Sequence, residues 1–217
     1  MTSDDEVLAG YRKSLSAFSI TAIVGDSLGR TGVMSSAIKP IDRDRKIAGR
    51  ALTVELSPGD LQDPLGALDL VRPGDIVVIN ARADEETAIW GGLMGTLFQL
   101  KGCRGAVIDG ACRDTDENRE QGFQVFTRSI TPRGSHTMFS GRRDDIRYQV
   151  PIICGGVLVE PGDIVVGDEL GVVVVPGGMA AETLRKVLTQ VEKEEETRKK
   201  VRDGWTVDQL LAEFGRI

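Results

Sequence analysis

The stretch from Gly91 to Glu117, GGLMGTLFQLKGCRGAVIDGACRDTDE, decides how the middle of this chain folds. Two glycines open an apolar run, Leu93–Leu100, whose length and composition are typical of a helix. The run RGAVIDG at 104–110 then has the apolar and β-branched residues of a buried strand. Arg113 and Asp114 follow directly. If the helix and the strand run antiparallel, the Arg-Asp turn must lie at the same edge as the start of the helix.

Outside that stretch, short strands and helices follow one another. Apolar residues at helical spacing occur near both ends of the chain, and Ser19 has the side chain of an N-cap. Runs of β-branched residues between Gly, Pro and Asp indicate short strands. We expect helices at 4–15, 20–29, 63–70, about 179–202 and 206–215, and strands at 46–56, 75–81, 122–130, 150–159 and 171–176.

One hexapeptide, PGDIVV, occurs twice, at 73–78 and at 161–166. An internal duplication would explain it. We favour repeated use of one local device, in which Pro and Gly form a turn, Asp caps it, and β-branched residues enter a buried strand. The second copy predicts a further strand immediately before 171–176.

The order of elements indicates a mixed α/β fold. Strands are many and short, with helices at both ends and one or two in the middle, and no linker-like segment divides the chain. We therefore predict a single domain over residues 1–217 with a charged C-terminal helical segment at about 179–217. The run EKEEETRKKVRDG at 192–204 is interpreted as the solvated face of that helix, with packing against a neighbouring subunit as the alternative.

Composition limits the classes of function. The net charge is −6 and no Lys/Arg cluster stands out, which argues against direct binding of nucleic acid. The three cysteines have neither CxxC spacing nor an even number, so we expect reduced thiols rather than disulfides or a zinc site. The first twenty residues lack the pattern of a secretory signal, and no apolar stretch reaches the ~20 residues of a membrane span. A cytoplasmic protein that does not bind membranes is expected.

The Gly91–Gly92 pair is the first candidate site. Glycines at a helix start let a ligand reach unpaired backbone N–H groups, where the helix dipole also favours a carboxylate or phosphate. The alternative is a glycine turn that only allows close packing, and from this feature alone the alternative is favoured.

The acidic and basic residues behind the strand are the second candidate. Arg113 offers a planar fork suited to a carboxylate. Asp114 can bind a hard cation, with Asp116 or Glu117 supporting it through water. An ordinary surface pair is the alternative. Taken together, the two candidates predict one pocket with amide donors, a guanidinium and a metal-binding carboxylate, which suits a small 2-oxo acid whose enolate must be stabilised.

Other chemistries are less well supported. The only histidine is His136, and a triad with Ser135 or Ser140 would lack a nucleophile elbow. Cys112 precedes an arginine that could lower its pKa, but packing is the favoured role. Lys101 could form a Schiff base, although a solvated cation at a helix end is expected there. The glycine-rich segments contain no nucleotide-binding motif.

The 91–117 stretch resembles the signature of the RraA-like family. This family includes class II, metal-dependent 4-hydroxy-4-methyl-2-oxoglutarate/4-carboxy-4-hydroxy-2-oxoadipate aldolases and regulators of ribonuclease E activity. Further segments match in the family's order: TAIVGDSLGR, GRALTV, RPGDIVVI, TPRGS and CGGVLVEPGDIVVGDELGVVVVP. The resemblance implies a swivelling three-layer β/β/α domain, here with flanking N- and C-terminal helices. It also implies a homotrimer or hexamer with pockets at subunit boundaries.

The resemblance also assigns residues. Arg113 matches the arginine that contacts pyruvate and stabilises its enolate, so it is the expected catalytic residue. Asp114 matches the ligand of a divalent metal, most often Mg²⁺ and sometimes Mn²⁺. Glu117 matches the acidic position three residues later. Glu117 and Asp116 are the residues that could support the metal through water. The residues that match the segment whose backbone amides hold the keto acid are Gly91, Gly92, Leu93 and Met94.

One position departs from the aldolase pattern. Gly92 stands where the fullest pattern has an Asp that organises metal-bound water, which puts proton transfer, and with it aldol cleavage, in question. A neighbouring subunit's C-terminal region also contributes an acid in the family, and the run at 192–196 offers several.

The implied activity is cleavage of 4-hydroxy-2-oxo acids to pyruvate, with oxaloacetate decarboxylation through the same enolate. The decarboxylation needs no base, so it should best survive the Gly92 change. The alternative is a regulator that binds ribonuclease E without catalysis, which would have no use for the Arg-Asp pair. A methyltransferase is disfavoured because no loop for S-adenosylmethionine is present.

Overall fold

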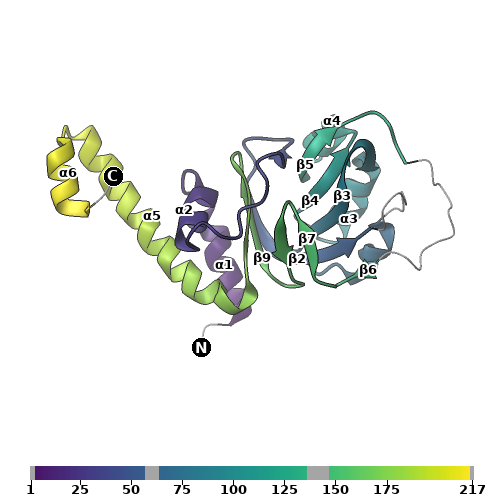
Figure 1. Cartoon of the computed structure of the whole chain (residues 1–217), viewed down its shortest axis with the longest axis horizontal. Helices are drawn as coiled ribbons and strands as arrows, with labels where there is room; N and C mark the ends of the chain where they lie inside the picture. The colour runs from purple at the N-terminus through teal and green to yellow at the C-terminus, as the bar shows by residue number, and fades with distance from the viewer. Residues whose placement is uncertain (1–2, 57–63, 136–146, 216–217) are drawn as a thin grey trace.

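A strongly curved β-sheet forms the centre of the molecule, with helices on either side of it (Figure 1). The computed structural model describes residues 3–56, 64–135 and 147–215. Its helices are α1 (Asp4–Ser14), α2 (Ile20–Ser27), α3 (Gly92–Leu100), α4 (Thr115–Glu120), α5 (Ala180–Arg202) and α6 (Val207–Phe214), with 3₁₀ turns η1 (Pro64–Leu70) and η3 (Gly177–Met179). Its strands are β1 (Lys39–Pro40), β2 (Ile47–Glu55), β3 (Ile76–Trp90), β4 (Gly105–Cys112), β5 (Gln124–Ile130), β6 (Arg147–Tyr148), β7 (Ile152–Cys154), β8 (Val157–Val159), β9 (Ile164–Asp168) and β10 (Gly171–Val175).

The main sheet has the order β1-β5-β4-β3-β2-β9-β10, with β6 paired to β2. Strands β2 to β5 are parallel neighbours, and β1, β6 and β9 join them antiparallel. The sheet curls until its two ends approach each other, since the Lys39 side chain beside β5 donates to the carbonyl of Leu170 next to β10 at 2.5 Å. The result is a nearly closed sheet. A separate hairpin, β7–β8, packs inside the curve.

Three apolar clusters hold these layers together. One lies inside the curved sheet and includes Val78, Val107 and Phe126. A second lies between the sheet and α3, and a third lies under α1, α2 and α5. The central strands are therefore buried on both faces, and every residue of β4 is buried. This explains why their sequences are almost continuously apolar.

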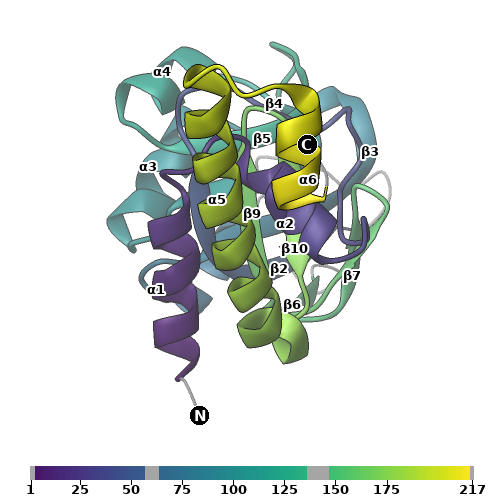
Figure 2. The same ribbon diagram turned by 90° about the vertical axis from the view of Figure 1, so that its left-hand side faces the viewer.

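The expected fold class is confirmed as a mixed α/β fold of the β/β/α kind with flanking helices. Figure 2 shows α1 and α5 side by side over one side of the sheet, with α6 at the far end of α5. The far half of α5 projects beyond the sheet, away from α3 and α4 (Figure 1). Within the described ranges, no helix is both long and apolar enough to cross a membrane.

The two PGDIVV copies form the same turn. In the first, the Asp75 carboxylate accepts from the backbone N–H of Arg72 at 2.9 Å. In the second, the Asp163 carboxylate accepts from the N–H of Glu160 at 2.8 Å. The glycine between Pro and Asp has a positive φ in both, 96° and 90°. The predicted device is confirmed, although the first copy leads into a parallel strand and the second into an antiparallel one.

Two local predictions were wrong in detail. Ser19 precedes α2 as predicted, but it lies in the left-handed region with φ 47° and its side chain makes no capping hydrogen bond. The segment predicted as a helix at 63–70 is a 3₁₀ helix over Pro64–Leu70, a tighter helix that occurs in short pieces. A capping box does start α6, where Thr206 and Gln209 exchange hydrogen bonds.

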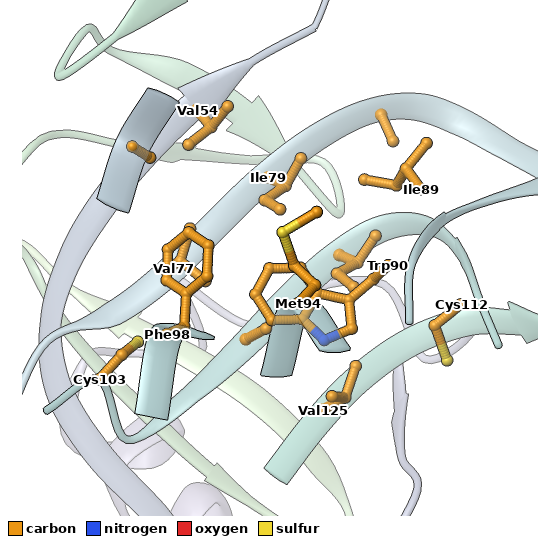
Figure 3. Packing of buried hydrophobic residues seen from close by; sticks show 14 of the residues in the cluster. Val54, Val77, Ile79, Ile89, Trp90, Met94, Phe98, Cys103, Cys112 and Val125 are labelled. Carbon is orange, nitrogen blue, oxygen red and sulfur yellow. The ribbon is translucent and has the colours of Figure 1, made fainter. Parts of the chain in front are cut away.

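An aromatic cluster fixes α3 on the sheet. Figure 3 shows Trp90 and Phe98 beside Met94, in the layer between α3 and the strands. The Trp90 and Phe98 ring centroids are 5.0 Å apart, and Phe123 stacks on Trp90 at 5.8 Å. Because Trp90 directly precedes Gly91, this cluster also determines where the helix begins.

Replacing Phe98 tests that anchoring role. Phe98 is fully buried, so Phe98→Ala is expected to lower the free energy of unfolding by about 3–5 kcal/mol through lost burial and a cavity. Urea denaturation measures the change. Leu100→Ala on the same helix is the control, because Leu100 is 80% exposed and its loss should change the stability by at most about 0.5 kcal/mol. Equal effects of the two substitutions would contradict the proposed anchoring.

Candidate active site

The start of α3 and the Arg-Asp turn meet, as predicted. Gly91 is the N-cap of α3 in an extended conformation, and as a glycine it has no side chain of its own to cap the helix. The first backbone N–H groups of a helix have no intrahelical acceptor. That of Gly92 donates to the Asp114 carboxylate at 3.2 Å, and those of Leu93 and Met94 come next in the same turn. An anion can therefore be held at this helix end.

Strand pairing explains the meeting. Strand β3 ends at Trp90 and the parallel strand β4 ends at Cys112, and these two residues are partners in the ladder. The N–H of Arg113 continues the pairing by donating to the carbonyl of Trp90 at 2.9 Å. The segments that follow β3 and β4 therefore leave the carboxyl edge of the parallel sheet side by side. This edge is the usual place for a ligand in such sheets.

The backbone of Asp114 directs its side chain towards α3. Asp114 has φ 50° and ψ 43°, in the left-handed region that Asp enters more readily than most residues. It is the N-cap of α4, yet its carboxylate does not cap that helix. The carbonyl of Asp114 instead accepts from both the backbone and the side chain of Asn118, at 3.1 and 2.9 Å. The carboxylate is thus free to face Gly92 and the site.

Glycines let α4 approach the start of α3 closely. A Cβ on Gly92 would lie 1.9 Å from Oε2 of Glu117, and a Cβ on Gly95 would lie 2.1 Å from Oδ1 of Asn118. A Cβ on Gly91 would lie 2.6 Å from Oδ2 of Asp114. The packing reading of the glycine pair is therefore correct, and it is compatible with the anion reading. The Glu117 carboxylate occupies the volume that a side chain at position 92 would need.

The Arg113 guanidinium lies at the opening of the site. Its Nε is 3.5 Å from the nearer Asp114 oxygen, and 47% of its side chain is exposed. It rests against Gly134, where a Cβ would lie 2.3 Å from Nη1. Gly134 is held next to Ala88 of β3 by a bridge. Sequence reasoning gave Gly134 no role, and only its place in TPRGS, a segment matched in the family's order, pointed to it.

Gln121, at the end of α4, is a second residue that sequence reasoning missed. Its Nε2 donates to the carbonyl of Gly92 at 3.2 Å, and its Oε1 accepts from the Thr96 hydroxyl at 2.6 Å. Its backbone carbonyl accepts from the Gln99 side chain at 2.9 Å. Gln121 therefore fastens the first turn of α3 to α4. No motif in the sequence identified it.

The remaining predicted residues differ in position. Leu93 is 76% exposed at the helix start, whereas the Met94 side chain is buried in the aromatic cluster. Their expected contribution through the backbone does not depend on the side chains. Asp116 is exposed on the first turn of α4 and has no ion-pair or hydrogen-bond partner among the described residues.

The carboxylates suit a hard cation that also binds water and substrate. Among the described residues, no group of three or more His, Cys, Asp or Glu side chains could enclose a metal ion. Asp114 and Glu117 nevertheless converge on the Gly91–Gly92 backbone, where added Cβ atoms would collide with both. Mg²⁺ is commonly held by one or two carboxylates together with waters and substrate oxygens. The donors present therefore fit Mg²⁺ or Mn²⁺ better than a fully enclosed structural metal.

The structure also decides among the alternative chemistries. Burial raises the pKa of Cys112 to about 11, so the idea that the neighbouring arginine lowers it is wrong and the packing role is supported. Lys101 is half-exposed at the end of α3, 3.8 Å from Asp69, as expected of a solvated cation. His136 and Ser140 lie outside the described residues. The acidic run 192–196 belongs to the far half of α5, at the other end of the same chain (Figure 1).

Comparison with known proteins shows which sequences and folds this chain resembles. A family model described as RraA-like, Aldolase/RraA, matches residues 21–174. A Halalkalibacterium halodurans protein named "Putative 4-hydroxy-4-methyl-2-oxoglutarate aldolase" is 33% identical over 184 residues, which cover 85% of each chain.

Two solved structures are similar over nearly the whole length. The crystal structure of a Pseudomonas syringae protein superposes with a TM-score of 0.82 at 25% identity, covering 97% of this chain and 94% of that one. Streptomyces coelicolor RraAS2, described as an unusual member of the RNase ES inhibitor RraA family, gives a TM-score of 0.75 at 28% identity. It covers 90% of this chain and 98% of its own.

Proposed function

Because the chain belongs to the RraA-like family, we propose that it is a divalent-metal-dependent carbon–carbon lyase that acts on small 2-oxo acids. Its substrates would be 4-hydroxy-2-oxo acids such as 4-hydroxy-4-methyl-2-oxoglutarate, cleaved to pyruvate, and oxaloacetate, decarboxylated to pyruvate. The observation that carries the proposal is the convergence of the first helix amides, the Arg113 guanidinium and two carboxylates at Gly91–Gly92, where the Gly92 amide already binds a carboxylate oxygen.

Substrate binding would use the positive groups. The amides of Leu93 and Met94 and the positive end of the α3 dipole would hold the C1 carboxylate of the 2-oxo acid. The Arg113 fork would lie against the C2 oxygen, where negative charge develops during the reaction. Arg113 can supply two parallel hydrogen bonds. Because its guanidinium already lies against Gly134, the side chain would lose less conformational entropy when the substrate binds.

Both reactions break the C3–C4 bond and pass through the same pyruvate enolate. In oxaloacetate, the C3–C4 bond breaks, C4 leaves as CO₂, and the electron pair passes to the C2 oxygen. In the aldol substrate, the C4 hydroxyl also loses its proton before the same bond breaks and a carbonyl product leaves. In each case the enolate is then protonated at C3 to give pyruvate. Arg113 stabilises the charge throughout.

Asp114 and Glu117 would hold the divalent metal, which when bound supplies Lewis-acid polarisation of the keto oxygen. Position 92 lacks the acid of the full aldolase pattern, and the Glu117 carboxylate lies where that side chain would begin. Among the described residues, Glu117 is therefore the acid besides Asp114 that could position water for proton transfer. Oxaloacetate decarboxylation, which needs no base, is proposed as the faster activity.

The proposed assembly is a homotrimer or a pair of trimers. The acidic run 192–196 is remote from the site of its own chain, so an acid from it could reach a site only in a neighbouring subunit (Figure 1). This would add a further carboxylate to Asp114 and Glu117.

Oxaloacetate turnover tests the proposal directly. Pyruvate formation is followed with lactate dehydrogenase and NADH, first with Mg²⁺ and then with excess EDTA. The enzyme-free Mg²⁺ rate is subtracted, because the metal alone decarboxylates oxaloacetate. We expect saturable turnover that EDTA removes, and then assay 4-hydroxy-4-methyl-2-oxoglutarate. A rate equal to the background for both substrates would refute the lyase.

A second candidate function follows from the similarity to RraAS2, whose description names RNase ES inhibition. The chain would then bind a ribonuclease without catalysis. A ribonuclease E cleavage assay with added protein discriminates the two functions. Inhibition without oxaloacetate turnover would favour the regulator, and the intact Arg113–Asp114 pair favours the enzyme.

A further inference from the structure

A second pocket opens at the opposite, amino edge of the parallel strands. It lies where the chain enters β2, β4 and β5, and it has a volume of about 230 Å³. We call it the amino-edge pocket. The residues that define it here are Arg45, Lys46, Gln99, Arg104, Gly122 and Phe123.

The charge of this pocket is opposite to that of the chain. Arg45, Lys46 and Arg104 line it, and none of the described residues that line it is acidic. The whole chain carries a net charge of −6. Arg12 and Arg50 lie close by, and Arg50 is paired with Asp5 at 2.7 Å. Burial, followed by the charges of Arg104 and Arg50, lowers the pKa of Arg12, against the opposing charges of Asp75 and Asp5. Like charges gathered at one edge create a positive potential that favours an anion.

Helix ends explain part of this charge. Helices α1, α3 and α4 finish near this edge, and cations are stabilised at the negative end of a helix dipole. Lys46 is partly engaged, since its Nζ donates to the carbonyl of Ala17, in the connection between α1 and α2, at 2.5 Å. The side-chain amide of Gln99 donates a hydrogen bond to the carbonyl of Gln121.

The two arginines remain available. Arg45 makes one contact with Asp42, 3.5 Å from Nε, and its guanidinium lies beside Gly122. Within the described part of the chain, the Arg104 side chain has neither a carboxylate partner nor a hydrogen-bond acceptor. A guanidinium carries five N–H donors, so the two arginines that line this small cavity keep most of their donors for a ligand.

Size and chemistry select the ligand. A cavity of about 230 Å³ lies below the roughly 300–1,000 Å³ of ordinary small-molecule pockets, so it suits a compact anion better than a whole nucleotide. Arginine forks match the oxygens of phosphate, and the ammonium of Lys46 adds a point charge. Phe123 and other apolar residues in the wall could contact a short carbon chain. We propose that the amino-edge pocket binds phosphate, either as the free ion or as the head group of a compact phosphate ester.

This pocket is separate from the keto-acid site. Helix α3 runs between them, with Gly92 at one site and Gln99 at the other, which corresponds to a distance of about 10 Å along the helix. Cys103 in the wall is not a competing nucleophile, because burial raises its pKa to about 11. The proposal therefore does not depend on the proposed lyase activity.

Calorimetric titration with inorganic phosphate, in EDTA and at low salt, tests the proposal. Arg104→Gln is expected to weaken binding about tenfold or more, because it removes a charge-assisted pair of hydrogen bonds. Arg43→Gln is the matched control: Arg43 is exposed in the same loop as Arg45 but does not line the pocket. Arg104→Lys, which keeps the charge, should give an intermediate affinity.

A second variant separates the two sites. Arg113→Ala removes the arginine of the keto-acid site, and phosphate binding at the amino-edge pocket should survive it. Glycerol 3-phosphate then distinguishes the two forms of the ligand. If it competes with phosphate for the pocket, the pocket accepts the head group of an ester, and if it does not compete, the ligand is the free phosphate ion. Equal affinities for Arg104→Gln and Arg43→Gln, complete loss of binding in Arg113→Ala, or no binding by the wild type would each overturn the proposal.

Discussion

Arg113→Ala is expected to lower kcat for oxaloacetate decarboxylation by a factor on the order of 10²–10³, the usual loss for one donor that stabilises a developing oxyanion. The charge on the C2 oxygen appears only as the C3–C4 bond breaks, so kcat should fall more than KM rises. Steady-state kinetics with saturating Mg²⁺ measures both. Arg113→Lys keeps the charge but loses the planar fork, and it should recover only part of the rate.

Arg119→Ala is the matched control for that experiment. Arg119 is an exposed arginine on α4, and its side chain makes one hydrogen bond among the described residues, at 3.4 Å to the carbonyl of Ile41 outside the site. The control should retain the wild-type kcat. If Arg113→Ala also retained full activity, the guanidinium would have no role in the reaction, whatever its place beside the helix start.

Asp114→Ala is expected to abolish metal-dependent turnover and to reduce the observed rate to that of free Mg²⁺. The substitution removes the carboxylate that faces Gly92 and leaves Glu117 as the nearest acid. A titration with Mn²⁺, followed by its paramagnetic effect on water relaxation, measures metal binding independently of activity. We expect the wild type to bind and the variant not to bind.

The backbone at position 114 requires a second variant. Alanine in the left-handed region costs about 1–2 kcal/mol, which could disturb the turn. Asp114→Asn keeps the preference for that conformation and the shape of the side chain, so its loss of Mn²⁺ binding can be attributed to charge. Glu120→Gln, at an exposed acid at the end of α4 with no assigned role, should bind normally. A normal response of either Asp114 variant to Mg²⁺ would exclude Asp114 as the metal ligand.

Local patterns were enough to identify the elements that carry the site. The apolar run after Gly91–Gly92 formed α3, the AVIDG run formed β4, and the Arg113–Asp114 turn met the helix start. These predictions succeeded because each depends on neighbours in the chain: helix spacing, β-branched runs, and the short connection that returns a strand to the helix start. The PGD turns succeeded for the same reason.

Other features depended on contacts between distant segments. The contact of Glu117 with Gly92, the support of Arg113 by Gly134, and the double role of Gln121 join residues that no spacing rule connects. The residue type of Ser19 predicted an N-cap, but Ser19 adopts a left-handed conformation and its side chain makes no capping hydrogen bond.

The amino acid sequence by itself thus determined the class of fold, the order of the elements and the two charged residues at the centre of the proposed site. Only the tertiary structure decided what surrounds them. Parallel pairing puts the starts of β2, β4 and β5 at one edge of the sheet, so cations that are scattered along an acidic chain gather around one pocket. The periodicity of apolar residues predicts which face of each segment is buried. The position of one segment relative to another follows from strand register and helix packing, and these depend on more than one segment.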